Sequence, residues 1–273
     1  MSTNNNVGIK GKVAVLTGGA GVLCSAMAIS LGKAGAKVVL LDIGEEAMED
    51  LGTVLEQNGT EYLAVKTNVL EKESIEQAAE TIISKFGRID ILINGAGGNK
   101  PTATTGPDKS FFDLPEDAVK WVFDLNFMGT FLACQVFGRY FADQKEGNII
   151  NVSSMNALTP LTKIPAYSAA KAAVSNFTQW LAVHMSQNYS TDIKVNGIAP
   201  GFLLTEQNRF LLTNKDGSLT DRGQTIIDHT PSARFGKPED LVSTIDWLVS
   251  PSSSFVHGIV VPIDGGFSAF SGV

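Results

Sequence analysis

The sequence predicts an α/β fold, in which helices cover both faces of a parallel β-sheet. Three observations predict it. Seven short runs are almost continuous in Val, Ile and Leu, which is typical of strands buried on both faces. Amphipathic helical segments alternate with these runs along the chain. No linker, low-complexity tract or short repeat interrupts the 273 residues, so a single domain over residues 1–273 is expected.

The predicted strands are short apolar runs rich in β-branched residues. They cover Lys12–Thr17, Lys37–Asp42, Tyr62–Thr67, Ile89–Asn94, Asn148–Ser153, Lys194–Ile198 and Ile259–Ile263. Because helical segments alternate with these strands, the strands are expected to run parallel and to be joined by right-handed crossovers.

The predicted helices lie between these strands and carry apolar residues at helical spacing. They cover Leu23–Ala34, Glu45–Asn58, Glu71–Phe86, Glu116–Asp143, Ala166–Asn188 and Pro238–Val249. Gly35 and Gly59 follow two of these helices, as helix-ending glycines do. Pro238 opens the last helix, with Glu239 and Asp240 in its first turn.

Two segments depart from this alternation. Gly97–Pro115 is rich in Gly, Pro, Thr and Asn, and Phe202–Arg234 has no steady period. Both follow predicted strands on the carboxyl side, where open α/β sheets bind ligands. We therefore expect residues 202–234 to form a substrate loop region, with a surface insertion as the alternative for each segment. Residues 1–10 are polar and Asn-rich and are expected to form a flexible N-terminus.

Composition limits the classes of partner. The chain has 21 Lys and Arg against 28 Asp and Glu, a formal charge of −7, and no run of basic residues. This balance argues against nucleic acid or an anionic membrane as the main partner. No stretch reaches the ~18 apolar residues of a membrane span, and the first residues do not resemble a signal peptide. A cytoplasmic location is therefore expected.

The cysteines and histidines show no metal-ligand pattern. Cys24 and Cys134 lie in apolar helical stretches and are expected to be small, buried and reduced. His184, His229 and His257 form no i, i+4 pair, so we expect no metal, and a zinc-dependent alcohol dehydrogenase is excluded. The sequence also lacks the Gly-x-Ser-x-Gly motif of serine hydrolases on an α/β sheet.

A glycine turn follows the first predicted strand and leads into a helix. Gly18, Gly19 and Gly21 lie in this turn, where glycine lets the backbone approach a phosphate and the helix dipole favours the anion. Asp42 ends the next strand at about the 20-residue distance at which an acidic residue binds an adenosine ribose. The pattern indicates a nucleotide site. The alternative for Asp42 is a cap of the helix that begins at Glu45.

Ser154, Tyr167 and Lys171 form a second candidate group. Tyr167 and Lys171 are spaced i, i+4 in a predicted helix, so their side chains share one face. The pKa of a tyrosine is ordinarily ~10, and an adjacent ammonium favours the phenolate. Lys171, acting with an oxidised nicotinamide, is therefore expected to lower the Tyr167 pKa. Such a tyrosine can donate a proton to a carbonyl oxygen during hydride transfer, or withdraw it in reverse.

Several motifs occur together in a familiar order. They are the turn at Gly18, Asn94–Gly97, Asn126, Ser154, Tyr167–Lys171 and Pro200–Gly201. In them the chain resembles the short-chain dehydrogenase/reductase superfamily over nearly its whole length. The resemblance implies a Rossmann-type, doubly wound sheet of seven strands, a nicotinamide cofactor, an alcohol or carbonyl substrate and a homotetramer. The family turn usually carries Gly where this chain has Val22 and Cys24.

The resemblance also implies roles for individual residues. Tyr167 is expected to be the acid/base, and Lys171 to lower its pKa and hold the nicotinamide ribose. Ser154 is expected to bind the substrate oxygen and Asn126 to hold a water in the proton relay; the alternatives are a turn residue and a helix cap. The residues expected to bind the cofactor are Gly18, Gly19, Gly21, Val22, Leu23, Asp42, Asn68, Val69, Asn94, Ala96, Gly97, Tyr167, Lys171, Pro200, Gly201 and Thr205.

A closer resemblance is to one branch of the superfamily. It rests on Thr17–Met27, Asn94–Thr105, Ser153–Lys171, Gly201–Arg209 and Asp264–Val273, which look like the D-mannonate oxidoreductases, also described as fructuronate reductases. That branch reduces the keto group of D-fructuronate to give D-mannonate. The alternatives are another sugar or polyol dehydrogenase, such as a gluconate 5-dehydrogenase-like enzyme, or a non-catalytic nucleotide-sensing protein of the same fold.

Asp42 also predicts which nicotinamide cofactor is used. Its carboxylate can accept hydrogen bonds from ribose hydroxyls, whereas the 2′-phosphate of NADP would meet a like charge. No Arg stands among the next four residues, Ile43 to Glu46. NAD(H) is therefore expected rather than NADP(H).

The loops beyond the sheet predict an anionic substrate, a keto sugar acid. They carry cations and amides where a neutral lipid would call for apolar walls. Arg209 is the first choice to bind the carboxylate, because a guanidinium can form two parallel bonds to it. The alternative is that these side chains are solvated loop residues. The candidate substrate residues are Asn99, Lys100, Asn156, Lys163 and Arg209, with Gln207 and Asn208 beside Arg209.

Overall fold

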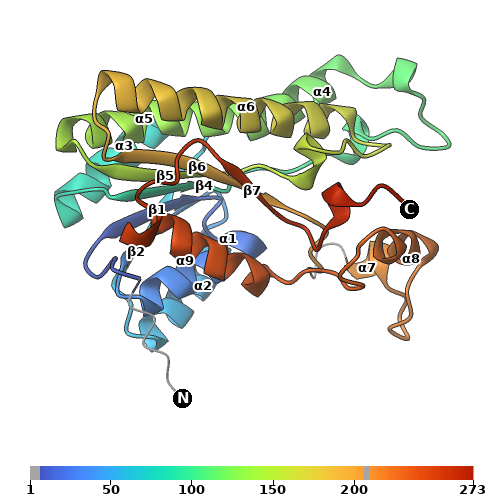
Figure 1. Cartoon of the computed structure of the whole chain (residues 1–273), viewed down its shortest axis with the longest axis horizontal. Coiled ribbons are helices and arrows are strands. Elements are labelled where there is room, and N and C mark those ends of the chain that lie inside the picture. Colours follow the sequence, from blue (N-terminus) through green and yellow to red (C-terminus); the bar gives the residue numbers. More distant parts are fainter. Residues whose placement is uncertain (1–6, 206–208, 273) are drawn as a thin grey trace.

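The computed structural model describes residues 7–205 and 209–272. Seven parallel strands form one sheet in the order β3-β2-β1-β4-β5-β6-β7 (Figure 1). This confirms the predicted doubly wound fold. The strands are β1 (Val13–Thr17), β2 (Lys37–Asp42), β3 (Tyr62–Lys66), β4 (Ile91–Asn94), β5 (Gly147–Val152), β6 (Ile193–Pro200) and β7 (Val260–Ile263).

Helices cover the sheet in two layers. Figure 1 shows α3, α5 and α6 on one face and α1, α2 and α9 on the other, with α7 and α8 beyond one end of the sheet. The bounds are α1 (Val22–Lys33), α2 (Glu45–Gln57), α3 (Lys72–Phe86), α4 (Glu116–Phe123), α5 (Gly129–Gln144), α6 (Pro165–Asn188), α7 (Arg209–Leu212), α8 (Asp221–Asp228) and α9 (Val242–Val249).

Alternate residues of each strand enter different cores. In β1, Ala14 and Leu16 pack toward α1, α2 and α9, while Val13 and Val15 pack toward α3, α5 and α6. Both faces of the central strands are therefore apolar, as the continuous runs predicted. The edge strand β3 differs from the prediction: Ala64 and Lys66 are exposed, because an edge strand is only partly covered.

The sheet order reverses beside β1. The chain leaves β3 at one edge and returns through α3 to β4 on the other side of β1. Thr17 pairs with Leu41 of β2 and with Asn94 of β4, so these strands end level with one another. Such a reversal at the carboxyl ends of parallel strands is where ligands bind.

Two predicted helices are not uniform. The predicted helix Glu116–Asp143 is α4 and α5 joined by a π-helical turn, Asp124–Met128. The one predicted over Pro238–Val249 begins as a 3₁₀ turn, Pro238–Leu241, before α9. The apolar spacing passes through both breaks, so hydrophobic periodicity alone did not reveal them.

The predictions for residues 1–10 and 202–234 also need correction. Val7 and Ile9 are buried against the core, so this part of the segment predicted to be flexible is packed; residues 1–6 lie outside the described part. Within residues 202–234 the structure has the short helices α7 and α8, which the sequence did not predict. They are only four and eight residues long, too short for a clear period.

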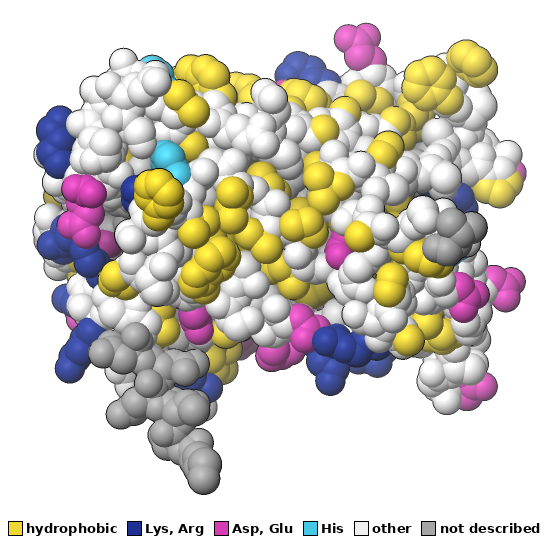
Figure 2. Space-filling model, viewed as in Figure 1, with side chains coloured by type: hydrophobic (Ala, Val, Ile, Leu, Met, Phe, Trp, Pro, Cys, Tyr) yellow, Lys and Arg dark blue, Asp and Glu magenta, His cyan; other side chains and the backbone are white. Residues whose placement is uncertain are grey.

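The types of side chain on the surface and the hydropathy of the helices indicate which kinds of partner the protein can contact. Figure 2 shows acidic and basic side chains scattered among apolar ones on the face in view. In residues 7–205 and 209–272, no helix is both long and apolar enough to cross a membrane.

Candidate active site

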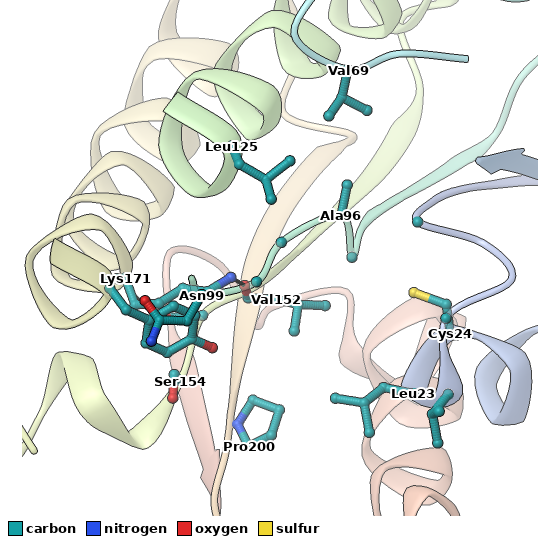
Figure 3. Close-up of a pocket in the computed structure, with 18 of the residues that line it drawn as sticks. Leu23, Cys24, Val69, Ala96, Asn99, Leu125, Val152, Ser154, Lys171 and Pro200 are labelled. Atoms are coloured by element: carbon teal, nitrogen blue, oxygen red, sulfur yellow. Dashed lines mark hydrogen bonds between the residues drawn. The ribbon is translucent and has the colours of Figure 1, made fainter. Parts of the chain in front are cut away.

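One cavity of about 970 Å³ opens at the carboxyl ends of the strands. Residues from β1, β2, β4, β5 and β6, or from the loops after them, line it together with residues of α1 and α6. Figure 3 shows Leu23 and Cys24 across the cavity from Ser154 and Lys171, with Leu125 and Val69 along the edge at the top of the view. The two groups predicted separately from the sequence therefore face the same space.

The glycine turn is pressed against the loop after β4. Gly18 has a φ of +60°, and a Cβ there would lie 2.8 Å from the backbone of Ala96, so only glycine fits. Gly21 then caps α1 without a side-chain hydrogen bond. The first N–H groups of α1 thus lack a side-chain cap at the cavity wall, and Gly21, Val22 and Leu23 all line it.

Gly19 does not line the cavity, contrary to the prediction. A Cβ there would meet the Leu16 oxygen at 2.8 Å and the Leu40 Cα at 3.0 Å. Its N–H donates to the Leu41 oxygen at 3.1 Å. Gly19 is therefore glycine because the turn packs on β2, and not because a ligand approaches it.

Asp42 lines the cavity and also supports the glycine turn. One carboxylate oxygen accepts a hydrogen bond from the Ala20 N–H, and the other accepts one from the Gly44 N–H, each at 3.1 Å. The alternative that Asp42 caps the next helix does not hold, because Gly44 is the N-cap of α2. Each carboxylate oxygen retains acceptor capacity for a further hydrogen bond.

Asn94 lies behind the cavity and not on its wall. It is buried, and its Nδ2 donates to Asn151 Oδ1 at 2.8 Å and to Cys134 Sγ at 3.2 Å. It therefore joins β4 to β5 and does not line the cavity, although it was expected to bind the cofactor. The sequence motif identified the strand end but not the side to which this residue points.

Both cysteines are buried, as predicted. Burial raises the pKa of each thiol to about 12, so both remain protonated. Cys24 also lines the cavity, and its Sγ donates to the Thr17 oxygen at 3.6 Å. A Cβ at Gly95 would overlap this sulfur. Gly95 therefore leaves the space that the bulkier Cys24 needs in this turn.

Ser154, Tyr167 and Lys171 meet on the opposite wall. Ser154 follows β5, and α6 carries Tyr167 and Lys171 one turn apart, as the spacing predicted. Lys171 is buried, its Nζ donates to the Val152 oxygen at 2.8 Å, and it lies 5.6 Å from the centre of the Tyr167 ring.

Burial sets the ionisation of this group. It raises the pKa of Tyr167 above its ordinary value, while a hydrogen bond with Ser154 acts in the lowering direction. Burial also lowers the pKa of Lys171 to about 8. Desolvation therefore outweighs the contact with Ser154, and the expected lowering of the Tyr167 pKa by Lys171 together with an oxidised nicotinamide stays a prediction.

Asn126 holds the loop after β4 in place from inside the π-helical turn. Its Nδ2 donates to the Gly98 and Val122 oxygens at 2.7 Å, and its Oδ1 accepts from the Gly98 N–H at 3.1 Å. A Cβ at Gly97 would lie 2.6 Å from Asn126 Oδ1 and 3.1 Å from Lys171 Nζ. Asn126, Gly97 and Lys171 therefore pack in direct contact, and Asn126 is neither a helix cap nor part of the cavity wall.

The five candidate substrate residues are not brought together. Asn99 lines the cavity, and its Nδ2 donates to Thr104 Oγ1 at 2.9 Å. Asn156 lies behind Ser154, to whose Oγ its N–H and Nδ2 donate at 3.3 and 3.2 Å. Lys163 and Arg209 are exposed and do not line the cavity, and residues 207 and 208 lie outside the described part.

Lys100 does not line the cavity, but its side chain contacts a residue that does. Its Nζ lies 3.7 Å from the centre of the Trp121 ring, and Trp121 lines the cavity. Trp121 and Leu125 were not predicted as wall residues, although their i, i+4 spacing in a predicted helix was a signal that they share a face. Three further apolar wall residues were not predicted: Ile164, just before α6, and Phe202 and Leu203, at the start of the second irregular segment.

A model of the short chain dehydrogenases matches residues 12–216. The chain belongs to the short-chain dehydrogenase family. It is therefore an oxidoreductase, as predicted. Among the residues that the structure describes, no group of three or more His, Cys, Asp or Glu is arranged to hold a metal.

Relatives of this short-chain dehydrogenase cover its whole length. An uncharacterized oxidoreductase UxuB of Bacillus subtilis (strain 168) is 50% identical over 97% of this chain and 98% of its own. A solved structure of a Haemophilus influenza protein, described as a proposed D-mannonate oxidoreductase with bound NAD, is 46% identical, with a TM-score of 0.92, over 98% of this chain and 99% of its own. The 5-keto-D-gluconate 5-reductase of Escherichia coli (strain K12) is 33% identical over 96% and 98%.

Proposed function

We propose that this short-chain dehydrogenase uses NAD(H) to interconvert a keto sugar acid and its hydroxy acid, with D-fructuronate and D-mannonate as the pair. One observation carries the proposal. A single cavity is lined on one side by the glycine turn with Asp42 and on the other by Ser154, Tyr167 and Lys171.

The residues on the first side fit a dinucleotide. The turn leaves no room for a Cβ at Gly18, and the N-terminus of α1 has no side-chain cap, so backbone N–H groups are available to a pyrophosphate. When bound, the nicotinamide supplies or accepts the hydride. The wall residues that would hold the cofactor are Gly18, Gly21, Val22, Leu23, Asp42, Asn68, Val69, Ala96, Gly97, Tyr167, Lys171, Pro200, Gly201 and Thr205.

The charge of this wall favours NAD(H) over NADP(H). Asp42 presents a carboxylate where a 2′-phosphate would meet repulsion. Among the described residues that line the cavity, Lys171 is the only Lys or Arg, and it lies on the opposite wall with its Nζ bound to the Val152 oxygen. No cation of the described wall therefore stands beside Asp42 to neutralise an added phosphate.

The second side fits proton transfer at a carbonyl oxygen. Tyr167 keeps its proton at neutral pH, because burial raises its pKa, so it can donate that proton as the keto oxygen becomes a hydroxyl. The Ser154 hydroxyl acts to lower the pKa of Tyr167 and can bind the substrate oxygen. Lys171 stabilises the phenolate that remains, and Asn126 holds Gly97 and Gly98 against this group.

The relatives support a sugar acid as substrate. The Haemophilus influenza protein is proposed to act on D-mannonate, and the Escherichia coli relative is a reductase of 5-keto-D-gluconate. Both compounds are acids of the sugar series with a hydroxyl or keto group to be converted. The second candidate function is therefore reduction of 5-keto-D-gluconate by the same residues.

The test is a panel of substrates with NADH, followed by the loss of NADH absorbance. The panel contains D-fructuronate, 5-keto-D-gluconate and neutral ketoses of the same length. We expect the highest kcat/KM with D-fructuronate. A higher kcat/KM for every neutral ketose would contradict the proposal, and 5-keto-D-gluconate as the best substrate would favour the second candidate. No turnover with either keto acid would exclude both substrates.

We further propose a homotetramer. Large apolar side chains are exposed on α6, with Trp180 56% and Val183 55% exposed, and near the C-terminus, with Phe255 fully exposed. His257, two residues beyond Phe255, lies against α6, with its Nε2 2.8 Å from the Ala182 oxygen, so these exposed side chains belong to neighbouring segments that could be covered by another copy. Light scattering should give about four times the 29.0 kDa of one chain. The cytoplasmic location stays a prediction.

A further inference from the structure

The side chain of Lys100 rests on the face of Trp121 at the cavity wall. Its Nζ lies 3.7 Å from the ring centre, the closest of the lysine–aromatic contacts in the described residues. Trp121 and the neighbouring Asn99 both line the cavity. A cation is therefore held at the edge of the space in which Ser154 and Tyr167 meet the substrate.

The backbone beneath Lys100 is firmly fixed. Its carbonyl oxygen accepts hydrogen bonds from the Ala103 N–H at 3.0 Å and from Thr104 Oγ1 at 2.9 Å. Ala103 is fully buried in a small apolar cluster, against which Trp121 and Tyr167 also pack. The lysine, the ring below it and the proposed acid/base are thus built on one packed unit.

Lys100 has no carboxylate partner among the residues that the structure describes. The ion pairs among those residues involve other cations, such as Lys120, which pairs with Asp124 on the next turn. A cation–π contact is weaker than a charge-assisted hydrogen bond to a carboxylate. An ammonium also has three N–H donors, so it can stay on the ring and still donate to an incoming carboxylate.

The second cation of the site is already engaged. Lys171 is buried, and its Nζ donates to the Val152 oxygen and packs beside Gly97. It serves the reacting end of the substrate. A sugar acid carries its carboxylate at a different carbon from the keto group, so a second cation is needed away from Tyr167.

We propose that Lys100 binds the carboxylate of the keto acid and that Trp121 is the positioning residue that aims it. This rests on the proposed function and names the residues that select an anionic substrate. Lys100 takes the place of Arg209 as first choice, because its ammonium lies on the wall residue Trp121; neither cation is itself a wall residue. Asn99, on the same wall, can add an amide hydrogen bond.

The experiment compares a keto acid with a neutral ketose in wild type, Lys100→Met, Lys100→Arg and Lys109→Met. The ratio of the two kcat/KM values is unaffected by the amount of folded enzyme. Lys100→Met should lower this ratio about 10–100-fold, mainly through KM for the keto acid, as expected for one lost charge-assisted contact. Lys100→Arg should keep most of the ratio. Lys109→Met removes a charge from the same loop away from the ring and should leave the ratio unchanged.

Two Trp121 variants distinguish a role in orienting Lys100 from a role in packing the cavity wall. Trp121→Phe retains an aromatic face and should keep the ratio within about threefold, whereas Trp121→Leu should lower it by more than that. Where the neutral ketose is too slow, inhibition constants of D-mannonate and D-mannitol give the same comparison without turnover. In wild type, KM for the keto acid should rise with salt, and Lys100→Met should weaken this dependence.

An unchanged ratio in Lys100→Met, or an equal loss with both substrates, would overturn the assignment of Lys100. A wild-type enzyme that prefers neutral ketoses would instead overturn the proposed function. The two failures are distinguishable, because the first is read from the variants and the second from the wild type alone.

Discussion

The part of the cavity wall around Asp42 and the loops that would hold the far end of the substrate are built from different kinds of structure. The side with Asp42 consists of strand ends, a glycine turn and a helix start, all joined by backbone hydrogen bonds. The side that would hold the far end of the substrate consists of loops and short turns after β4 and β6. The first side depends on backbone geometry, whereas the second depends on which side chains the loops carry.

This difference predicts where substitutions act. Removing the proton donor, which lies across the cavity from Asp42, should stop catalysis and leave most of the cofactor binding in place. Changes at the glycine turn and Asp42 should alter cofactor use. Changes in the loops should alter substrate choice. Substitutions in these three groups can therefore be told apart by which property they change, and the largest effect is expected at the acid/base.

Tyr167→Phe should have the largest effect. It removes only a hydroxyl, so the fold and NADH binding should persist while kcat falls about 10²–10⁴-fold, as expected for a lost acid/base. Steady-state kinetics and an NADH titration by fluorescence measure the two properties separately. A variant that keeps half of the wild-type kcat would show that the acid lies elsewhere.

Gly97→Ala should have the next largest effect on kcat. The new Cβ would lie 2.6 Å from Asn126 Oδ1 and 3.1 Å from Lys171 Nζ, so both must shift, and we expect kcat to fall on the order of 10²-fold. Gly98→Ala is the matched control, since its Cβ would meet only Leu125 at 3.9 Å. Similar losses in both variants would show that the contact with Asn126 and Lys171 does not matter.

Asp42→Asn should change the choice of cofactor. It keeps an oxygen that can accept from the backbone but removes the charge, so the preference for NADH over NADPH should fall about 10–100-fold. The measurement is kcat/KM with each cofactor. Glu45→Gln, an exposed charge on the start of α2, is the control and should leave the preference unchanged. An unchanged preference in Asp42→Asn would remove Asp42 from the ribose site.

The smallest of these effects is expected for a change of pH, which should alter the reductive kcat/KM little near neutrality. Burial lowers the pKa of Lys171 to about 8, so its ammonium is present below that pH and is lost as the pH rises through it. The reductive kcat/KM should therefore fall above pH 8, about tenfold per unit at most. Lys171→Arg keeps its charge over this range, because a guanidinium has a pKa above ~12. If that variant shows the same fall at pH 8, another group titrates there.

The contrast between the two sides also explains what the sequence could predict. Tyr167, Lys171 and Asp42 have a fixed spacing within, or at the end of, a regular element, so their meeting at one cavity followed from strand order. Gly19 and Asn94 also belong to motifs that were expected to bind the cofactor, but Gly19 packs on β2 and the Asn94 side chain is bound to Asn151. A motif fixes the backbone path more closely than it fixes the direction of each side chain.

The substrate side was harder to predict for a physical reason. Lys100 reaches the cavity only because its side chain lies on Trp121, which is 21 positions further along the chain. Asn156 turned out to donate hydrogen bonds to Ser154 behind the wall. Such contacts depend on how loops fold against helices, and no period in the sequence encodes them.

The most direct test of the central claim is one stoichiometric reaction with the wild-type enzyme. NADH and D-fructuronate are mixed, and both the loss of NADH and the identity of the product are measured. The account predicts one D-mannonate formed for each NADH consumed. Consumption of NADH with neutral ketoses and with no keto acid would contradict it.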